Sequence, residues 1–153
     1  MSKTDGPGAE LTRTLGYLLK HAQLQMAGLN TAALAPYGID GRDLGVLLVL
    51  AGHEPTSQQQ AAQRLGVDRT TMVALLDTLE ARGLVSRHPD ADDRRRNVVE
   101  LTAGGQDTLR RAVAASAGAE RALLAPLTPQ AAQQLRDALR AIVIPPGSAP
   151  SPP

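Results

Sequence analysis

The sequence contains no cysteine, tryptophan or phenylalanine, and its two tyrosines are Tyr17 and Tyr37. The absence of cysteine excludes disulfides, thiolate metal sites and thiol-based redox sensing. A core without large aromatic rings has to be built from leucine, valine, alanine and methionine, which suits packed helices. No apolar run approaches the roughly 18 residues of a membrane span, and the N-terminus lacks a basic stretch followed by an apolar segment. We therefore expect a soluble, cytoplasmic protein.

Neither sign of charge is in excess. The net charge is +1 over 153 residues, and residues 40–102 combine eight arginines with ten acidic residues, a net charge of −2. Any affinity for nucleic acid would have to come from local clusters of arginine. Hydrophobic residues make up 42% of the chain, enough for a core, so the length indicates one domain, or one domain with helical extensions.

Hydrophobic spacing predicts a mainly α fold with one small β-hairpin, formally an α+β class. Helices are expected at 10–35, 44–52, 57–66, 68–83, 102–125 and 128–143, and the hairpin strands at 84–88 and 97–101. Pro36, Gly38 and Gly41 are expected to interrupt the chain after the first helix. The ends, residues 1–8 and 145–153, are rich in proline, glycine and serine, and we predict that they are disordered tails.

Side chains able to cap helices mark several of these boundaries. Ser57 and Gln60 have the spacing of a capping box, in which the hydroxyl and the amide satisfy N–H groups at the helix start. Asp68 suits the N-cap of the next helix, and Gly66 and Gly83 suit the left-handed positions that follow helix ends. The other predicted caps are Thr102 and Thr128, the latter followed by Pro129. The segments 57–66 and 68–83 therefore form a helix-turn-helix.

The loop between the predicted strands combines three aspartates with three consecutive arginines, Arg94, Arg95 and Arg96. Guanidinium groups stay charged and suit phosphates or a narrow minor groove. A helix-turn-helix followed by a hairpin with a cationic tip suits duplex DNA, with the second helix in the major groove and the arginines at a neighbouring minor groove or its phosphates. We expect Asp93 to hydrogen-bond Arg95 across the turn and set its direction. A solvated loop of mixed charge is the alternative.

The second helix of the pair, residues 68–83, is predicted to bury one face and expose the other. The apolar stripe consists of Met72, Leu75, Leu76 and Leu79, and the opposite face presents Thr70, Ala74, Asp77 and Ala81. Hydroxyls can bond phosphates or base edges, methyl groups can contact thymine, and a helix N-terminus favours phosphate. The candidate DNA contacts are Ser57, Gln58, Arg69, Thr70, Thr71, Val73, Ala74, Arg87, Arg94, Arg95 and Arg96. An ordinary polar helix face is the alternative.

Three motifs together resemble the MarR family of winged helix-turn-helix transcriptional regulators: LEARGLV, which ends the second helix, the loop DADDRRR, and LTAGG, which opens the following helix. The resemblance implies a homodimer in which a helical region, 9–36 and 103–144, joins the subunits and 37–102 forms the DNA-binding lobe. It further implies pseudo-palindromic operators, repression, and release by small, often aromatic or anionic, molecules. Many relatives carry threonine and arginine where this chain has Val73 and Ala74, so a side chain suited to reading guanine is missing here.

A stripe on the first predicted helix is the candidate effector site. Arg13, Tyr17 and His21 follow at intervals of four residues and would offer a cation, a phenol and an imidazole to an anionic aromatic ligand. Tyr37 and His53 are further candidates for the same cleft. A polar helix face or a dimer contact is the alternative. The three histidines of the chain lack the short spacing of metal ligands, so we expect no metal site and no cofactor.

Two other classes of function are alternatives to DNA binding. A winged helix that contacts proteins instead of DNA would agree with the net charge of −2 over residues 40–102. An enzyme is not expected, because no serine–histidine–acid arrangement, phosphate-binding glycine loop or metal motif is present. The neighbouring carboxylates Asp92 and Asp93 belong to the predicted loop rather than to a pocket.

Overall fold

The computed structural model describes residues 6–52 and 55–147, so the outer parts of both predicted tails lie outside the described residues. The elements in chain order are η1 (Leu11–Arg13), α1 (Leu15–Leu34), η2 (Ala35–Tyr37), α2 (Gly41–Ala51), β1 (Thr56–Ser57), α3 (Gln58–Leu65), α4 (Arg69–Ala81), β2 (Val85–Pro89), β3 (Asn97–Leu101), α5 (Ala103–Leu124) and α6 (Pro129–Val143). The predicted class, mainly helical with a small antiparallel sheet, is confirmed. No helix in the described ranges is long and apolar enough to cross a membrane.

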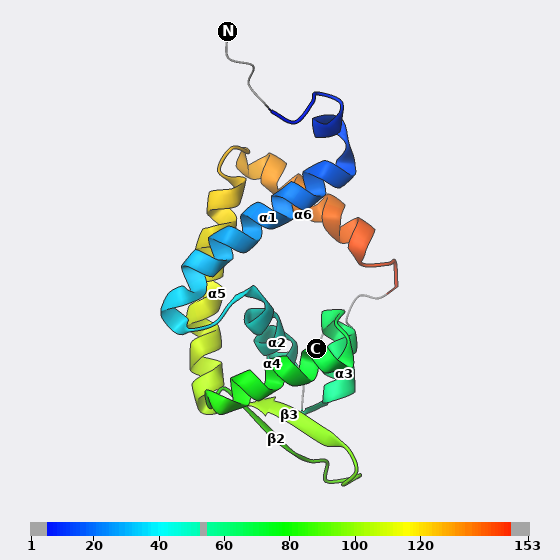
Figure 1. Cartoon of the computed structure of the whole chain (residues 1–153), viewed down its shortest axis with the longest axis vertical. Coiled ribbons are helices and arrows are strands. Elements are labelled where there is room, and N and C mark those ends of the chain that lie inside the picture. Colours follow the sequence, from blue (N-terminus) through cyan, green and yellow to red (C-terminus); the bar gives the residue numbers. More distant parts are fainter. Residues whose placement is uncertain (1–5, 53–54, 148–153) are drawn as a thin grey trace.

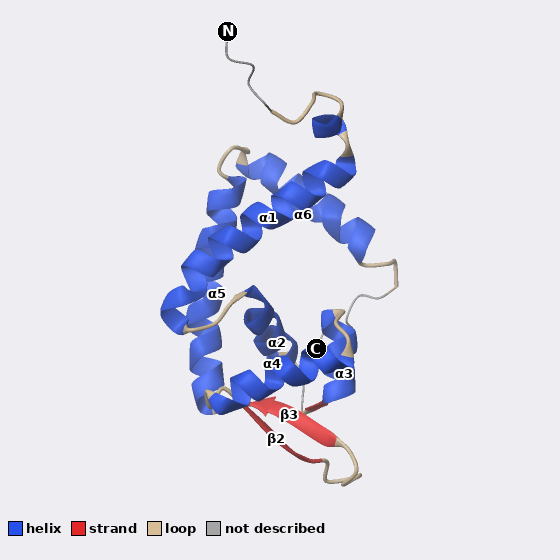
Figure 2. Ribbon diagram, in the orientation of Figure 1, coloured by secondary structure: helices blue, strands red, loops and turns tan. Residues whose placement is uncertain are grey.

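The helices divide into two groups that α5 connects (Figure 1). Helices α1 and α6 lie at one end of the molecule. Helices α2, α3 and α4 form a lobe with the sheet at the other end, and α5 runs along the side from one end to the other. The hairpin of β2 and β3 lies at the edge of the lobe farthest from α1, and the loop at its tip projects beyond the helices (Figure 2).

Two predicted boundaries near the N-terminus were wrong. The first helix is interrupted at Thr14, whose extended backbone (ψ 136°) separates η1 from α1. Helix α2 begins at Gly41, which was expected to interrupt the chain. Asp40 caps this helix: the N–H of Asp43 donates to Asp40 Oδ1 (2.9 Å), and the N–H of Asp40 donates to Asp43 Oδ2 (3.0 Å). The reciprocal cap offsets the poor helix propensity of a leading glycine.

The predicted caps of the helix-turn-helix are confirmed. The N–H of Gln60 donates to Ser57 Oγ (3.1 Å), and the N–H of Ser57 donates to Gln60 Oε1 (3.2 Å). Gly66 and Gly83 follow α3 and α4 with φ of 72°, the left-handed region that costs a glycine little. The caps at Thr102 and Thr128 also form.

The sheet has three strands in the order β1-β3-β2, all antiparallel. Val99 in the central strand pairs with Arg87 of β2 on one side and with Thr56 of β1 on the other. The sequence did not predict β1, because a strand of two residues carries no periodic signal. Its pairing places the start of α3 against the half of the hairpin that is nearer to its tip.

The core of the lobe is aliphatic, as the absence of large aromatic residues requires. Three of the four residues of the predicted α4 stripe are fully buried, and Leu75 is half-buried. The largest fully buried side chains are Leu34, Val46, Leu47, Met72, Leu76, Leu79, Val85 and Val99. Burial of this stripe fixes which face α4 presents to solvent.

Candidate nucleic-acid interface

The N-terminal turn of α4 is fixed by Asp68. The backbone N–H and the hydroxyl of Thr71 donate to the two oxygens of the Asp68 carboxylate at 2.7 and 3.0 Å. These bonds, the backbone one first, lower the pKa of Asp68 below its ordinary value, because they favour the charged form. Thr71 is half-buried and its hydroxyl is committed to the cap, whereas Arg69 and Thr70 are exposed beside it.

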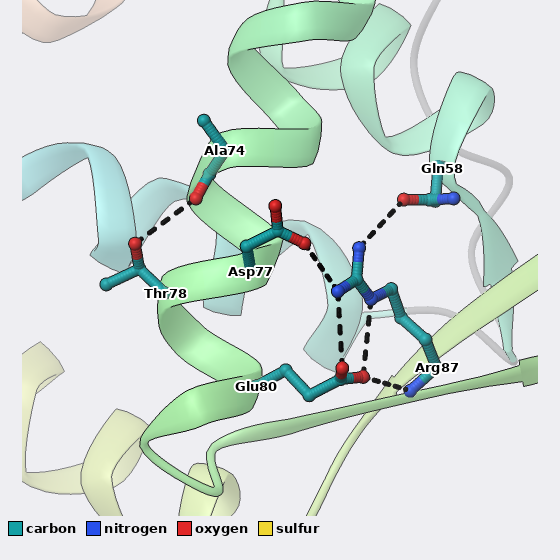
Figure 3. Close-up of polar contacts among 6 residues, drawn as sticks. All are labelled: Gln58, Ala74, Asp77, Thr78, Glu80 and Arg87. Atoms are coloured by element: carbon teal, nitrogen blue, oxygen red, sulfur yellow. Dashed lines mark hydrogen bonds and ion pairs between the residues drawn. The ribbon is translucent and has the colours of Figure 1, made fainter.

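The face of α4 opposite the buried stripe is open to solvent, as predicted. Its small side chains would let a partner approach closely; those exposed are Thr70, Ala74, Thr78 and Ala81, with Val73 half-buried. The hydroxyl of Thr78 donates to the carbonyl oxygen of Ala74 (3.2 Å), so it is occupied by the backbone of its own helix (Figure 3).

At the start of α3, Ser57 and Gln58 lie differently from what was expected of two DNA contacts. Ser57 is only 6% exposed, since it pairs with Val98 of β3 and caps the helix. Its hydroxyl caps the helix, and its contact with DNA stays a prediction. Gln58 is half-buried and its side-chain oxygen faces Arg87. Pairing of β1 with β3 could not be read from the local sequence, and it buries these residues.

The tip of the hairpin is shaped by its aspartates. The N–H of Asp90 donates to the carbonyl oxygen of Arg96 (2.8 Å), and the N–H of Arg96 donates to that of Asp93 (3.0 Å). Asp93 Oδ1 accepts from the backbone N–H of Arg95 (3.1 Å), so Asp93 sets the course of the chain at Arg95 rather than holding its guanidinium. Side chains of Arg94, Arg95 and Arg96 are exposed, and within the described part of the chain none of them forms an ion pair.

The fold brings the arginines of the tip to the helix-turn-helix. A polar cavity of about 140 Å³ separates the hairpin from the starts of α3 and α4; it is lined by Ser57, Gln58, Gln59, Arg69, Arg95, Arg96 and Asn97. Three arginines, one from α4 and two from the hairpin loop, therefore border one polar cavity. Such an arrangement suits a polyanion such as a phosphate backbone.

Comparison with known proteins agrees with this geometry. The MarR family profile matches residues 37–96. The transcriptional repressor CouR, solved bound to a 23-mer DNA duplex, is 34% identical, with a TM-score of 0.85 over 91% of this chain and 99% of CouR. This chain belongs to the MarR family.

A second structure of CouR and one further relative are also similar to this MarR-family chain. CouR from Rhodococcus jostii RHA1 bound to p-coumaroyl-CoA is 30% identical, with a TM-score of 0.78 over 90% of this chain and 97% of that one. The HTH-type transcriptional repressor NicR of Pseudomonas putida is 30% identical over 101 residues. That alignment covers 66% of this chain and 64% of NicR.

Arg87, a predicted phosphate contact in this MarR-family chain, is instead occupied within the protein. Its guanidinium pairs with Asp77 and Glu80 of α4 and lies 3.5 Å from Gln58 Oε1, and its side chain is 20% exposed (Figure 3). The sequence did not identify Glu80 as part of the site. Its position seven residues before Arg87, across a helix end, has no local signature.

Of the predicted effector residues that the structure describes, Tyr17 and His21 are in contact, and Arg13 and Tyr37 lie in other elements. The rings of Tyr17 and His21 stack with centroids 4.0 Å apart. Arg13 lies in η1, beyond the break at Thr14, so it does not continue their helical stripe. Tyr37 lies in η2, beyond the end of α1 at Leu34, and Leu34 is itself roughly 26 Å from Tyr17 along the helix at about 1.5 Å per residue. His53 lies outside the described residues. No cluster of possible metal ligands occurs in residues 6–52 and 55–147.

Proposed function

We propose that this chain is a homodimeric transcriptional repressor that binds specific duplex DNA and is released by a small aromatic or anionic molecule. The observation that carries the proposal is the cavity bordered by Arg69, Arg95 and Arg96 beside the exposed face of α4. Lysine and arginine that neutralise phosphates supply most of the salt-dependent affinity of such proteins. The positive end of the α4 dipole adds to this attraction.

In this proposal α4 enters the major groove. Thr70 and Ala74 are exposed and small, so the helix backbone can come close to the base edges. Arg94, Arg95 and Arg96 then reach the neighbouring minor groove or its phosphates. The negative total over residues 40–102 is compatible with this, because the uncompensated arginines gather on one surface while several carboxylates serve as caps or ion-pair partners.

The dimer is inferred from an apolar groove of about 600 Å³ between α1 and α6, with α5 at its end. Its lining includes Leu15, Leu18, Leu19, Met26, Leu123, Leu135, Leu139 and Val143. Such a large apolar surface is costly to leave in water and marks an interface. We propose that a second copy covers it, so that 9–36 and 103–144 join the subunits. Two α4 helices would then lie roughly 34 Å apart, one turn of DNA.

Release by an effector is proposed because a relative has been solved with a small-molecule ligand. CouR has been solved with p-coumaroyl-CoA, an aromatic and anionic ligand. In this chain the stacked pair Tyr17 and His21 is what remains of the predicted effector stripe, and we propose it as part of the ligand contact. We further propose that the protein acts in the cytoplasm and performs no catalysis.

Selection of bound genomic fragments tests the function. Purified protein is mixed with sheared DNA, the recovered fragments are sequenced, and their affinity is measured by mobility shift from low to moderate salt. We expect a pseudo-palindromic consensus and a log–log salt slope that indicates several phosphate contacts. Absence of a consensus, together with affinity independent of salt, would favour the alternative of a protein-interaction module. A screen for compounds that release the fragments then tests the effector.

A further inference from the structure

Arg87 on β2 is the centre of a polar network that links three elements of the lobe (Figure 3). One of its terminal nitrogens donates to Asp77 Oδ1 at 2.5 Å and to Glu80 Oε1 at 3.2 Å. Its Nε and its backbone N–H both donate to Glu80 Oε2, at 3.2 and 3.1 Å. The other terminal nitrogen lies 3.5 Å from Gln58 Oε1. The hairpin is thereby tied to α4 and to the start of α3.

In this network the guanidinium of Arg87 is mostly buried, and the two carboxylates are more exposed. The side chain of Arg87 is 20% exposed, whereas those of Asp77 and Glu80 are 59% and 41% exposed. Four of the five N–H groups of the guanidinium are occupied by partners in the protein. A bidentate contact with a DNA phosphate, which needs two N–H groups, would require Arg87 to give up at least one of its bonds within the protein.

In the proposed binding mode, the negative charges of Asp77 and Glu80 on α4 oppose DNA binding. Asp77 shares the exposed face of α4 with Thr70 and Ala74, the face we propose for the major groove. Like charges brought together across an interface weaken association strongly. The hydrogen bond from the Arg87 side chain lowers the pKa of Glu80, so protonation does not remove this charge near neutral pH. The guanidinium of Arg87, which pairs with both carboxylates, is what offsets their negative charge.

We propose that Arg87 is a positioning residue for DNA binding: it is the internal counter-ion that masks Asp77 and Glu80 and holds the hairpin against α4, and it does not itself contact DNA. This inference rests on the proposed function. It requires that the loss of Arg87 be harmful because two carboxylates are uncovered, and that neutral replacements of those carboxylates repair the loss.

Four variants test this by mobility shift on a selected fragment at fixed salt. Arg87→Ala should weaken binding at least tenfold. The triple variant Arg87→Ala, Asp77→Asn, Glu80→Gln should return to within about threefold of the double variant Asp77→Asn, Glu80→Gln. Arg110→Ala is the matched control, since this arginine also pairs with a carboxylate, Asp107, but on α5. Its affinity should be unchanged.

A salt series separates masking from direct contact. Loss of one phosphate contact reduces the log–log slope by about 0.9, whereas loss of an internal counter-ion leaves the slope near the wild-type value. A triple variant as weak as Arg87→Ala, or a slope reduced by one contact, would overturn the proposal. Arg87→Gln, which retains N–H donors without the charge, replaces Arg87→Ala if circular dichroism shows the latter unfolded, and the same results are expected. If the wild type binds no DNA, the proposed function fails and this inference falls with it; if the wild type binds and only the rescue fails, the proposed function stands.

Discussion

Gly105, in the first turn of α5, lies directly against the backbone of Leu84, so closely that a methyl group on the glycine would overlap the Leu84 carbonyl oxygen. The hydroxyl of Thr102 donates to the carbonyl oxygen of Gly83 at 2.5 Å, and the N–H of Gly105 donates to that hydroxyl at 3.0 Å. The start of α5 is thereby joined to the connection between α4 and β2. The absence of a side chain at residue 105 makes this contact possible.

Gly105→Ala should therefore destabilise the protein by about 3 kcal/mol or more, because the clash is with backbone that cannot rotate away. Thermal or urea unfolding measures it. Gly104→Ala is the control: its added carbon would lie 3.5 Å from the carbonyl oxygen of Gly83, an ordinary contact, so stability should be retained. Equal stability of the two variants would contradict the close packing at Gly105.

Arg95→Ala should weaken operator binding at least tenfold and reduce the salt slope by about 0.9, as for the loss of one phosphate contact. Arg95 is exposed, borders the cavity with Arg69 and has no ion-pair partner among the described residues. Arg121→Ala, in the last turn of α5 and far from the hairpin, should bind as the wild type does. Wild-type affinity of Arg95→Ala in a salt-controlled mobility shift would remove Arg95 from the interface.

Asp93→Ala should weaken DNA binding several-fold with little change in melting temperature. It deletes the acceptor for the N–H of Arg95 and loosens the exposed tip, while the core is untouched. Asp93→Asn keeps a side-chain oxygen in that position and removes a negative charge, so it should bind at least as tightly as the wild type. Should the asparagine variant bind as weakly as the alanine variant, the charge rather than the turn would be what matters.

Ile142→Asp should convert the dimer into a monomer. Ile142 is 73% exposed in the single chain, so a charge there costs little within the subunit but is costly in an apolar interface. Sedimentation velocity measures the mass in solution. Gln134→Asp, at an exposed polar residue of the same helix that does not line the apolar groove, should remain dimeric. A dimeric Ile142→Asp would place the subunit contact elsewhere.

Asp43→Asn should change how stability depends on pH. Burial raises the pKa of Asp43, and the charge of Asp40 acts in the same direction, against the hydrogen bond from the Asp40 N–H and the charge of Arg82. The folded state thus holds this proton more tightly than the unfolded chain, so the stabilisation is complete at low pH and is lost as pH rises through the folded-state pKa. The melting temperature of Asp43→Asn minus that of the wild type, measured at the same pH, should therefore increase from acid to neutral pH. A difference that stays constant over this range would contradict the prediction.

Local chemistry explains why the helix-turn-helix could be predicted. The capping pair Ser57 and Gln60, the cap Asp68 and the glycines after α3 and α4 act over three or four residues, and each forms as predicted. The break at Thr14 was missed, because leucines continue at helical spacing on both sides of it. Periodicity reports which residues could share a face, and it does not report where the backbone leaves the helix.

The sequence by itself determined the order of helices, the buried stripe of α4 and the arginine-rich tip, because these depend on near neighbours along the chain. Tertiary structure alone decided that β1 buries Ser57, that Arg69 borders the same cavity as Arg95, and that Arg87 is held by Asp77 and Glu80. In a sequence, an arginine that pairs with a carboxylate cannot be told from one that does not. Which of them is available to a partner depends on carboxylates brought in from other elements, and that pairing exists only once the hairpin has packed on α4.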